Sequence, residues 1–309
     1  MTKLRLAELT SGEAKTRLSN RPTILLPMGS LEDQGPHAPM GDYLLADAIA
    51  LRIAERAVAL GADALVAPVL PFGGEDYFGT VPGGIALSHA TLLAVIREML
   101  ERLLAHGLDR ILIVNGHGGN THAIHEATLA VKHADGTLIP SLYIWRVLYG
   151  AWPKLTGGDT AGKVGHGADP VWSVAQALFP QLCRPDMIPD PVPASSVQGM
   201  AVTGLGAARF EEIEIGLPIE YDIAAPNGVL AGDPRRAELV HQRLLERAAQ
   251  LRVPVRHRQR RVERVGGVVA RKGDMALEGG SGLIGDRGAG EQRSHGCDQR
   301  ARTALHAGK

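Results

Sequence analysis

Short apolar runs recur through the first half of the chain and are separated by longer segments. Each run is apolar throughout rather than alternating between apolar and polar positions, which is typical of parallel strands covered on both faces. We therefore expect a buried strand at each run. The runs are TILLPM (23–28), ALVAPVL (64–70), RILIVN (110–115) and TLIPSLYIW (137–145).

The segments between these runs have the apolar spacing of helices. They are YLLADAIALRIAERAVAL (43–60), HATLLAVIREMLERLLAHG (89–107) and a stretch from about Thr121 to His133. Strand–helix alternation of this kind predicts an α/β fold with a doubly wound, mainly parallel sheet. Ligands bind such sheets at the carboxyl ends of the strands. The loops 29–42 and 115–120 each follow a strand directly, so we expect both on that rim.

The pattern changes near the C-terminus. A helical spacing over 236–251 stops abruptly, and the sequence that follows is rich in Arg and Gly, lacks aromatic residues and has no sustained period. We expect one folded domain over 1–252 and a disordered tail over 253–309. A basic nucleic-acid-binding arm is the alternative, and the lack of aromatic residues argues against it.

Composition narrows the class of protein. The 309 residues carry a formal net charge of zero, which argues against a nucleic-acid partner. No apolar stretch approaches the ~20 residues that a membrane span needs, and the N-terminus lacks the apolar region of a secretory signal. The two cysteines, Cys183 and Cys297, form no disulfide or zinc pattern. We expect a soluble cytoplasmic protein.

Candidate metal ligands crowd the loop LEDQGPHAPMGD (31–42). Glu32, Asp33, His37 and Asp42 are close in sequence, and prolines stiffen the backbone between them. Carboxylates and imidazole together are the usual ligands of Zn, Mn or Fe. The alternative is a polar loop in which Asp42 only caps the helix that begins at YLLADAIA.

A second candidate is His117 in NGHGGN (115–120). Flanking glycines allow a sharp turn and a close approach to a bound group, and a histidine at the end of a strand suits metal ligation or proton transfer. The alternative is a glycine turn with an incidental histidine. A phosphate-binding loop is disfavoured because the pattern is neither GxGxxG nor a Walker sequence.

Two further loops carry polar side chains. His166 lies between glycines and is a candidate general acid, whereas Asp169, before Pro170, can be an ordinary helix cap. The glycine-rich stretch 71–84 carries Glu75 and Tyr77 and is expected to face the substrate; a solvated loop is an equally fair interpretation.

These stretches resemble the creatininase (creatinine amidohydrolase) family, in order, from about residue 20 to about residue 240. The resemblance is carried by PMGSLEDQGPHAPMGDYLLADAIA, FGTVPGGIALS, HGLDRILIVNGHGGN, the HGAD segment and GVLAGDPRRA. It implies a layered α/β/α fold over 1–252, a metal-dependent site that is usually dinuclear, and a hexameric homo-oligomer. Members of the family hydrolyse cyclic amides, formamides and strained cyclic ketones.

The resemblance implies that Glu32, Asp42 and His117 hold one divalent metal, which would be Zn, Mn or Fe. The histidine for a second metal falls on Gln34, and a further Glu falls on Gly119, so a second metal site is uncertain. It would be lost, filled weakly, or rebuilt from residues such as Asp33, His37 or Asp169.

The same resemblance makes His166 the general acid. Asp169 replaces a Glu, and Val171 and Trp172 depart from the family pattern, which argues against creatinine as substrate. The glycine-flanked backbone at 116–119 is a candidate donor to an oxyanion, and Gly118 and Gly119 are expected to face the substrate.

We expect a metal-dependent hydrolase that uses metal-activated water on a small polar cyclic amide or formamide. The alternatives are cleavage of a C–C bond in a strained cyclic ketone such as a dehydro-inosose, and a non-catalytic relative that binds a metabolite. An unrelated Rossmann-like nucleotide-binding protein is disfavoured because the chain has no early phosphate-binding glycine loop.

Overall fold

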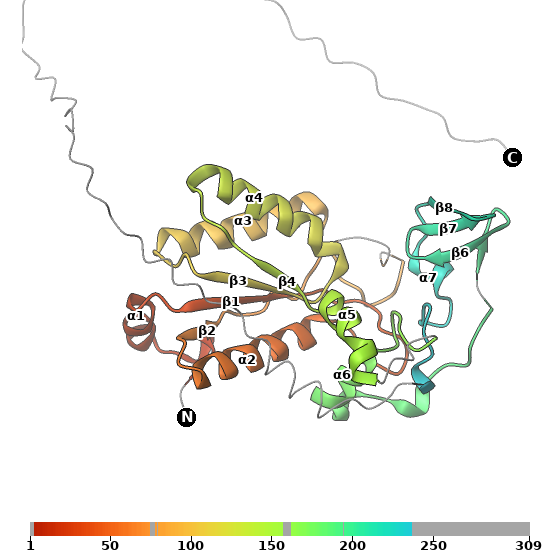
Figure 1. The fold of residues 1–309 in the computed structure, drawn as a ribbon, viewed down its shortest axis with the longest axis horizontal. Coiled ribbons are helices and arrows are strands. Elements are labelled where there is room, and N and C mark those ends of the chain that lie inside the picture. Colours follow the sequence, from red (N-terminus) through yellow and green to blue (C-terminus); the bar gives the residue numbers. More distant parts are fainter. Residues whose placement is uncertain (1–2, 75–77, 79, 157–161, 194, 237–309) are drawn as a thin grey trace, which may run out of the picture. The chain divides into compact units, whose positions relative to one another are not determined.

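A four-stranded parallel sheet forms the centre of the computed structural model, which describes residues 3–74, 78, 80–156, 162–193 and 195–236. The strand order is β2-β1-β3-β4, so the first strand lies in the interior of the sheet (Figure 1). All three pairings are parallel, as expected for apolar runs linked by helices. The strands are β1 (Thr23–Met28), β2 (Ala64–Val66), β3 (Ile111–Asn115) and β4 (Ser141–Tyr143).

Helices cover both faces of this sheet, and successive residues of β1 face opposite layers. Leu25 packs into the core on the side of α2, α5 and α6, whereas Ile24 and Leu26 pack into the core on the side of α3 and α4. The α/β/α layering with a parallel sheet predicted from the sequence is thereby confirmed. The covering helices are α2 (Tyr43–Ala59), α3 (His89–Ala105), α4 (Thr121–Asp135), α5 (Ile144–Thr156) and α6 (Val171–Leu178).

Two predicted strands are shorter than the apolar runs that indicated them. The run 137–145 forms a strand only over Ser141–Tyr143, because its last residues, Ile144 and Trp145, begin α5. The run 64–70 forms a regular strand only over Ala64–Val66, although Leu70 still bridges to Met28 at the end of β1. Apolar character alone does not separate a strand from the helix or extended loop that follows it.

A second, antiparallel sheet was missed by the sequence analysis. Its strands join in the order β5-β6-β7-β8, and several of its apolar residues are exposed, so it lacks the buried runs of the central sheet (Figure 1). The strands are β5 (Ser196–Val197), β6 (Met200–Gly204), β7 (Ala207–Phe210) and β8 (Ile213–Gly216).

Short helices complete the described residues. At the N-terminus, α1 (Ser11–Ser19) begins at a capping box formed by Thr10 and Glu13, and α7 (Tyr221–Ala224) follows the second sheet. The 3-10 helices are η1 (Leu6–Glu8), η2 (Gly118–Asn120), η3 (Pro180–Leu182), η4 (Pro185–Met187) and η5 (Pro234–Arg236). No helix in this described part of the chain is both long and apolar enough to span a membrane. The predicted tail, 253–309, lies outside the described residues.

Candidate metal centre

The loops after β1 and β3 bring three candidate ligands together at the carboxyl edge of the sheet. Met28 pairs with Asn115, so the two strands end side by side. Glu32 Oε2 lies 2.7 Å from His117 Nδ1, and Asp42 Oδ2 lies 3.4 Å from the same nitrogen. All three side chains are at least 95% buried. Two carboxylates and one imidazole therefore converge in the interior, on one point.

Asp42 occupies the N-cap position of α2, but its side chain makes no cap hydrogen bond to that helix. Instead, Oδ1 accepts the backbone N–H of Ser30 at 2.7 Å, which leaves Oδ2 on the side of His117. Asp42 thus lies at the N-cap position, but its side chain does not cap the helix. The cap alternative raised by the sequence does not describe this side chain.

The ring of His117 is fixed by the bond on its far side. His117 Nε2 lies 3.2 Å from the carbonyl oxygen of Gly74. Because a carbonyl oxygen can only accept, the proton of the neutral ring belongs on Nε2, and the Nδ1 lone pair faces the two carboxylates. Burial lowers the pKa of His117, but the charges of Glu32 and Asp42 outweigh it and raise that pKa well above its usual value.

Two buried asparagines at the ends of NGHGGN hold this loop in place. The side chain of Asn115 donates to the carbonyl oxygen of His117 at 2.7 Å and accepts the backbone N–H of His117 at 3.0 Å. Asn120 accepts the backbone N–H of Gly74 at 2.8 Å and donates to Gly29 at 3.1 Å. These asparagines were not singled out from the sequence, although polar side chains directly after a buried strand were the signal for them.

Gln34 lies next to the three candidate ligands. Its Nε2 donates to Glu32 Oε1 at 2.6 Å, so the amide occupies the carboxylate oxygen that does not face His117. The other amide atom, Oε1, is buried and makes no hydrogen bond to the residues that the structure describes. Gln34 therefore orients Glu32 and presents a polar oxygen beside it.

A cavity of about 100 Å³ opens onto this group of side chains. Glu32, Asp42 and His117 line it together with Gln34 and His166. Its remaining walls are a glycine, four aromatic and two aliphatic residues: Gly118, Phe78, Tyr143, Trp145, Tyr149, Val171 and Leu205. The polar groups thus face a small space with largely apolar walls, the usual arrangement of a small-molecule site.

His166 is partly buried in the wall of the cavity. Its Nε2 lies 2.6 Å from the carbonyl oxygen of Asp33, so Nε2 carries the proton of the neutral ring and Nδ1 is left as the acceptor. The ring packs against Phe78 and Tyr221, each with ring centroids 5.0 Å away. Burial among these groups lowers the pKa of His166 to about 4, so the ring is neutral at pH 7.

Other predicted site residues lie elsewhere. His37 does not line the cavity: its Nε2 donates to the carbonyl oxygen of Gly167 at 2.8 Å, and its ring packs edge-on against Trp172. Asp169 is buried, and its Oδ1 accepts the hydroxyl of Ser173 at 2.6 Å and the Ser173 backbone N–H at 3.3 Å. The N-cap of α6 is Pro170, so Asp169 binds the first turn of the helix from the residue before the cap.

The two predicted glycines, Gly118 and Gly119, differ in their position relative to the cavity. Gly118 lines the cavity, whereas the carbonyl oxygen of Gly119 packs against Gly74, 2.7 Å from where a Cβ atom on Gly74 would lie. The predicted substrate-loop residues Glu75 and Tyr77 lie outside the described residues.

Aromatic residues of this site were not singled out from the sequence. Trp145 donates from Nε1 to the carbonyl oxygen of Gly116 in the β3 loop, and Tyr221 donates from its hydroxyl to Gly228 at 2.6 Å. Both come from segments outside the ligand loops, and only the folded chain brings Trp145 to the cavity and Tyr221 against His166.

Comparison with known proteins extends this picture. The family model described as "Creatininase: Creatinine amidohydrolase" matches residues 7–252. Creatinine amidohydrolase of Pseudomonas putida is 31% identical over 209 residues, which is 62% of this chain and 77% of that protein. The 3-dehydro-scyllo-inosose hydrolase of Thermotoga maritima is 26% identical over 236 residues, 72% of each chain.

A third relative matches a shorter region. The mycofactocin precursor peptide peptidase of Mycolicibacterium smegmatis is 34% identical over 114 residues, 36% of this chain and 46% of that protein. The chain thus spans about half the length of this peptidase.

Solved creatininase structures have the same fold as this chain. One described as a manganese form has a TM-score of 0.65, and a mutant of Zn–Zn type has a TM-score of 0.64. Each is 24% identical and covers 81% of this chain and 95% of that structure. Since the family model spans most of the sequence and the fold agrees with that of the solved structures, this chain belongs to the creatininase family of hydrolases.

Proposed function

We propose that this protein is a metal-dependent hydrolase of a small polar cyclic amide or formamide, with one divalent metal held by Glu32, Asp42 and His117. The observation that carries the proposal is the convergence of two buried carboxylates on His117 Nδ1, at 2.7 and 3.4 Å. Three buried ionisable groups this close are costly unless a cation or proton compensates them. The tautomer of His117 set by Gly74 suits a cation.

The donor set limits the choice of metal. One nitrogen and two carboxylate oxygens suit Zn, Mn or Fe. A metal bound here would lower the pKa of water toward ~7 and polarise a substrate carbonyl. Among the solved relatives, one creatininase is described as a manganese form and another as a Zn–Zn type.

The side chain of Gln34 supports a single metal rather than a pair. Its amide donates to Glu32 Oε1, so this oxygen is already engaged by a hydrogen bond within the site. An amide is a weaker metal ligand than an imidazole or carboxylate, and Gly119 offers no side-chain ligand. Neither His37 nor Asp169 lines the cavity to replace the missing ligands. We therefore propose one metal per site.

His166 fits the role of a proton shuttle better than that of a resting acid. The ring is neutral at pH 7, and its Nε2 proton is engaged by the Asp33 carbonyl oxygen. Nδ1 can accept a proton as the nucleophile attacks and can then return it to the departing nitrogen. The aromatic rings of Phe78 and Tyr221 exclude water from one side of the imidazole.

The volume of the cavity supports a small substrate. About 100 Å³ has room for a few non-hydrogen atoms and is well below the 300–1,000 Å³ of drug-sized sites. This favours a small ring or formamide over a peptide, although one relative is a precursor peptide peptidase. Of the three positions that depart from the family pattern, Val171 lines the cavity, and its replacement argues further against creatinine itself.

The second candidate substrate is a strained cyclic ketone, cleaved at a C–C bond. It is favoured by the inosose hydrolase of Thermotoga maritima, which matches 72% of each chain. The same residues would serve, with His166 returning its proton to a departing carbanion instead of an amine. The third candidate function is non-catalytic binding of a metabolite. The presence of the buried triad, Glu32, Asp42 and His117, together with His166 argues against it.

A substrate panel tests the proposal. The protein, supplied with Zn²⁺ or Mn²⁺, is assayed with creatinine, lactams, formamides, cyclic ketones and short peptides. We expect turnover of a cyclic amide or formamide that disappears in His117→Ala and with chelator. Turnover only of a ketone would select the second candidate, whereas chelator-insensitive turnover or a metal content near zero after purification without chelator would overturn metal dependence.

By the same resemblance we propose that the protein assembles as a homo-oligomer, with a hexamer as the expected form. Light scattering coupled to size-exclusion chromatography measures the mass of the particle directly. A monomer across the working concentration range would contradict this part of the proposal.

A further inference from the structure

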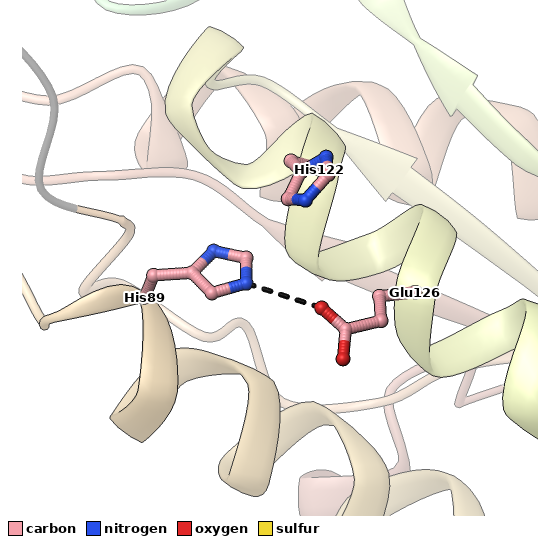
Figure 2. A group of neighbouring side chains, drawn as sticks. All are labelled: His89, His122 and Glu126. Carbon is pink, nitrogen blue, oxygen red and sulfur yellow. Dashed lines mark hydrogen bonds and ion pairs between the residues drawn. The ribbon is translucent and has the colours of Figure 1, made fainter.

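A second group of metal-ligating side chains lies on the surface, across the starts of two helices. His89 is the first residue of α3, and His122 and Glu126 lie one turn apart on α4. Each offers one ligand atom, and the three atoms lie within 4.8 Å of one another. Figure 2 shows the three side chains facing a common space between the helices.

We propose that His89, His122 and Glu126 form a surface site for a transition-metal ion, with Zn²⁺ as the preferred ion. Two imidazoles and one carboxylate are a ligand set that Zn²⁺ uses with water in the fourth position. A hard ion such as Mg²⁺ prefers oxygen ligands and should bind much more weakly. The site is independent of the proposed hydrolase function, because it shares no residue with the buried triad.

The distances within the cluster are compatible with closure around an ion. His89 Nε2 lies 3.2 Å from Glu126 Oε2, and the two imidazole centroids are 5.1 Å apart. Ligand atoms bound at about 2.0–2.2 Å in a tetrahedron are separated by a little over 3 Å. His89 and His122 are exposed, so small rotations of unconstrained side chains can bring the nitrogens to that spacing.

The carboxylate of Glu126 is already oriented for this role. Arg97 Nη2 lies 3.4 Å from Oε1. This leaves Oε2 for His89, and Figure 2 shows that contact. An outer-shell hydrogen bond of this kind commonly fixes a ligating carboxylate. The guanidinium also repels a cation, so we expect binding weaker than at the buried triad.

An ion at this surface cluster would tie the start of α3 to the start of α4. The segment before α3 is connected to the inner site, because Leu87 pairs with Gly74, whose carbonyl oxygen lies 3.2 Å from His117 Nε2. Binding to the folded state alone raises stability with ion concentration. Zn²⁺ should therefore raise the unfolding temperature through this cluster.

The test counts Zn²⁺ ions on the full chain by equilibrium dialysis with Zn²⁺ alone. We expect His89→Ala and His122→Ala each to bind one equivalent fewer than the wild type at the same free Zn²⁺ concentration. His125→Ala is the matched control, since His125 is an exposed histidine on the same helix but outside the cluster. It should bind as much Zn²⁺ as the wild type.

Two outcomes would overturn the proposal: a His122→Ala variant that binds as much Zn²⁺ as the wild type, or a His125→Ala variant that loses as much as His122→Ala. Thermal unfolding with and without Zn²⁺ gives a second readout, in which the cluster variants should lose part of the Zn²⁺-dependent increase. An equal increase in His122→Ala and wild type would count against the site. Because the substituted side chains are exposed, these variants should fold.

Discussion

The Nδ1 atom of His117 lies 2.7 Å from Oε2 of Glu32, although the two residues follow different strands of the sheet. On the other side of the ring, Nε2 faces the carbonyl oxygen of Gly74. The ring is thus held between an anion and a backbone acceptor, which fixes its orientation and, in the neutral ring, leaves Nδ1 as the nitrogen that can bind a metal. The position of the candidate metal therefore depends on this contact between Glu32 and His117.

Removing the imidazole should remove the metal. We expect His117→Ala to lower metal affinity by more than the 10–100-fold that the loss of an outer-shell partner costs, because a direct ligand is lost. Metal per chain, measured by plasma emission after dialysis, checks this. His125→Ala serves as the control, and unchanged metal content at the inner site in His117→Ala would show that the ligand assignment is wrong.

Gln34 should act on the metal through Glu32. Gln34→Ala removes the 2.6 Å hydrogen bond to Glu32 Oε1, so we expect metal affinity to fall roughly 10–100-fold. Competition with a chelator of known affinity measures the change. An affinity equal to that of the wild type would mean that Gln34 does not orient the carboxylate.

His166 should affect turnover rather than metal binding. If Nδ1 exchanges the proton with the substrate, His166→Gln should lower kcat by about 10²–10⁴-fold while metal per chain stays the same. The exposed His106, at the end of α3, provides a control substitution His106→Gln with no expected effect. A His166→Gln variant with full kcat would exclude the proton-transfer role.

The pH dependence of stability offers a separate test of His166 in the metal-free protein. Burial holds the folded pKa at about 4, whereas the unfolded chain has the ordinary value of 6.5. Below 6.5 the unfolded state gains a proton that the folded state does not, so stability should fall as pH drops from 6.5 toward 4. The difference between the two pKa values corresponds to a total loss of about 3 kcal/mol in the free energy of unfolding, complete once the pH lies below both pKa values.

Urea unfolding of the wild type and His166→Gln at several pH values measures this contribution. Both proteins keep the other titrating groups, including His117. Those groups therefore contribute equally to the pH dependence of the unfolding free energy in the two proteins. Stability should fall less steeply with decreasing pH in His166→Gln. Parallel curves for the two proteins would show that His166 titrates normally.

Gly29 should be intolerant of a side chain because of Asp42. A Cβ atom at Gly29 would lie 2.5 Å from Asp42 Oδ1 and 2.5 Å from the backbone of Tyr43. We expect Gly29→Ala to cost about 1–3 kcal/mol and to weaken metal binding as Asp42 shifts. Gly12→Ala in α1, where nothing lies within 4 Å, is the matched control and should not destabilise. Chemical unfolding with metal analysis measures both effects.

The order of strands and helices could be predicted from the sequence, because parallel strands and their covering helices leave strong local patterns. The strand 23–28 has the predicted bounds, and the helix predicted over 43–60 ends only one residue early. The second sheet could not be predicted, since exposed residues such as Phe210 and Ile213 break the apolar pattern. Where an apolar run continued into a helix, as at Ile144, its end was misplaced.

The sequence by itself determined the candidate ligands, because chemistry that needs carboxylates and histidines beside glycines is visible as residue types in short loops. Tertiary structure decided what each of them does. It turned Asp42 from its helix toward His117, engaged His37 with Gly167 and Asp169 with Ser173, and left Gln34 beside Glu32. These roles depend on contacts between distant segments, and such contacts exist only once the sheet has aligned the ends of its strands.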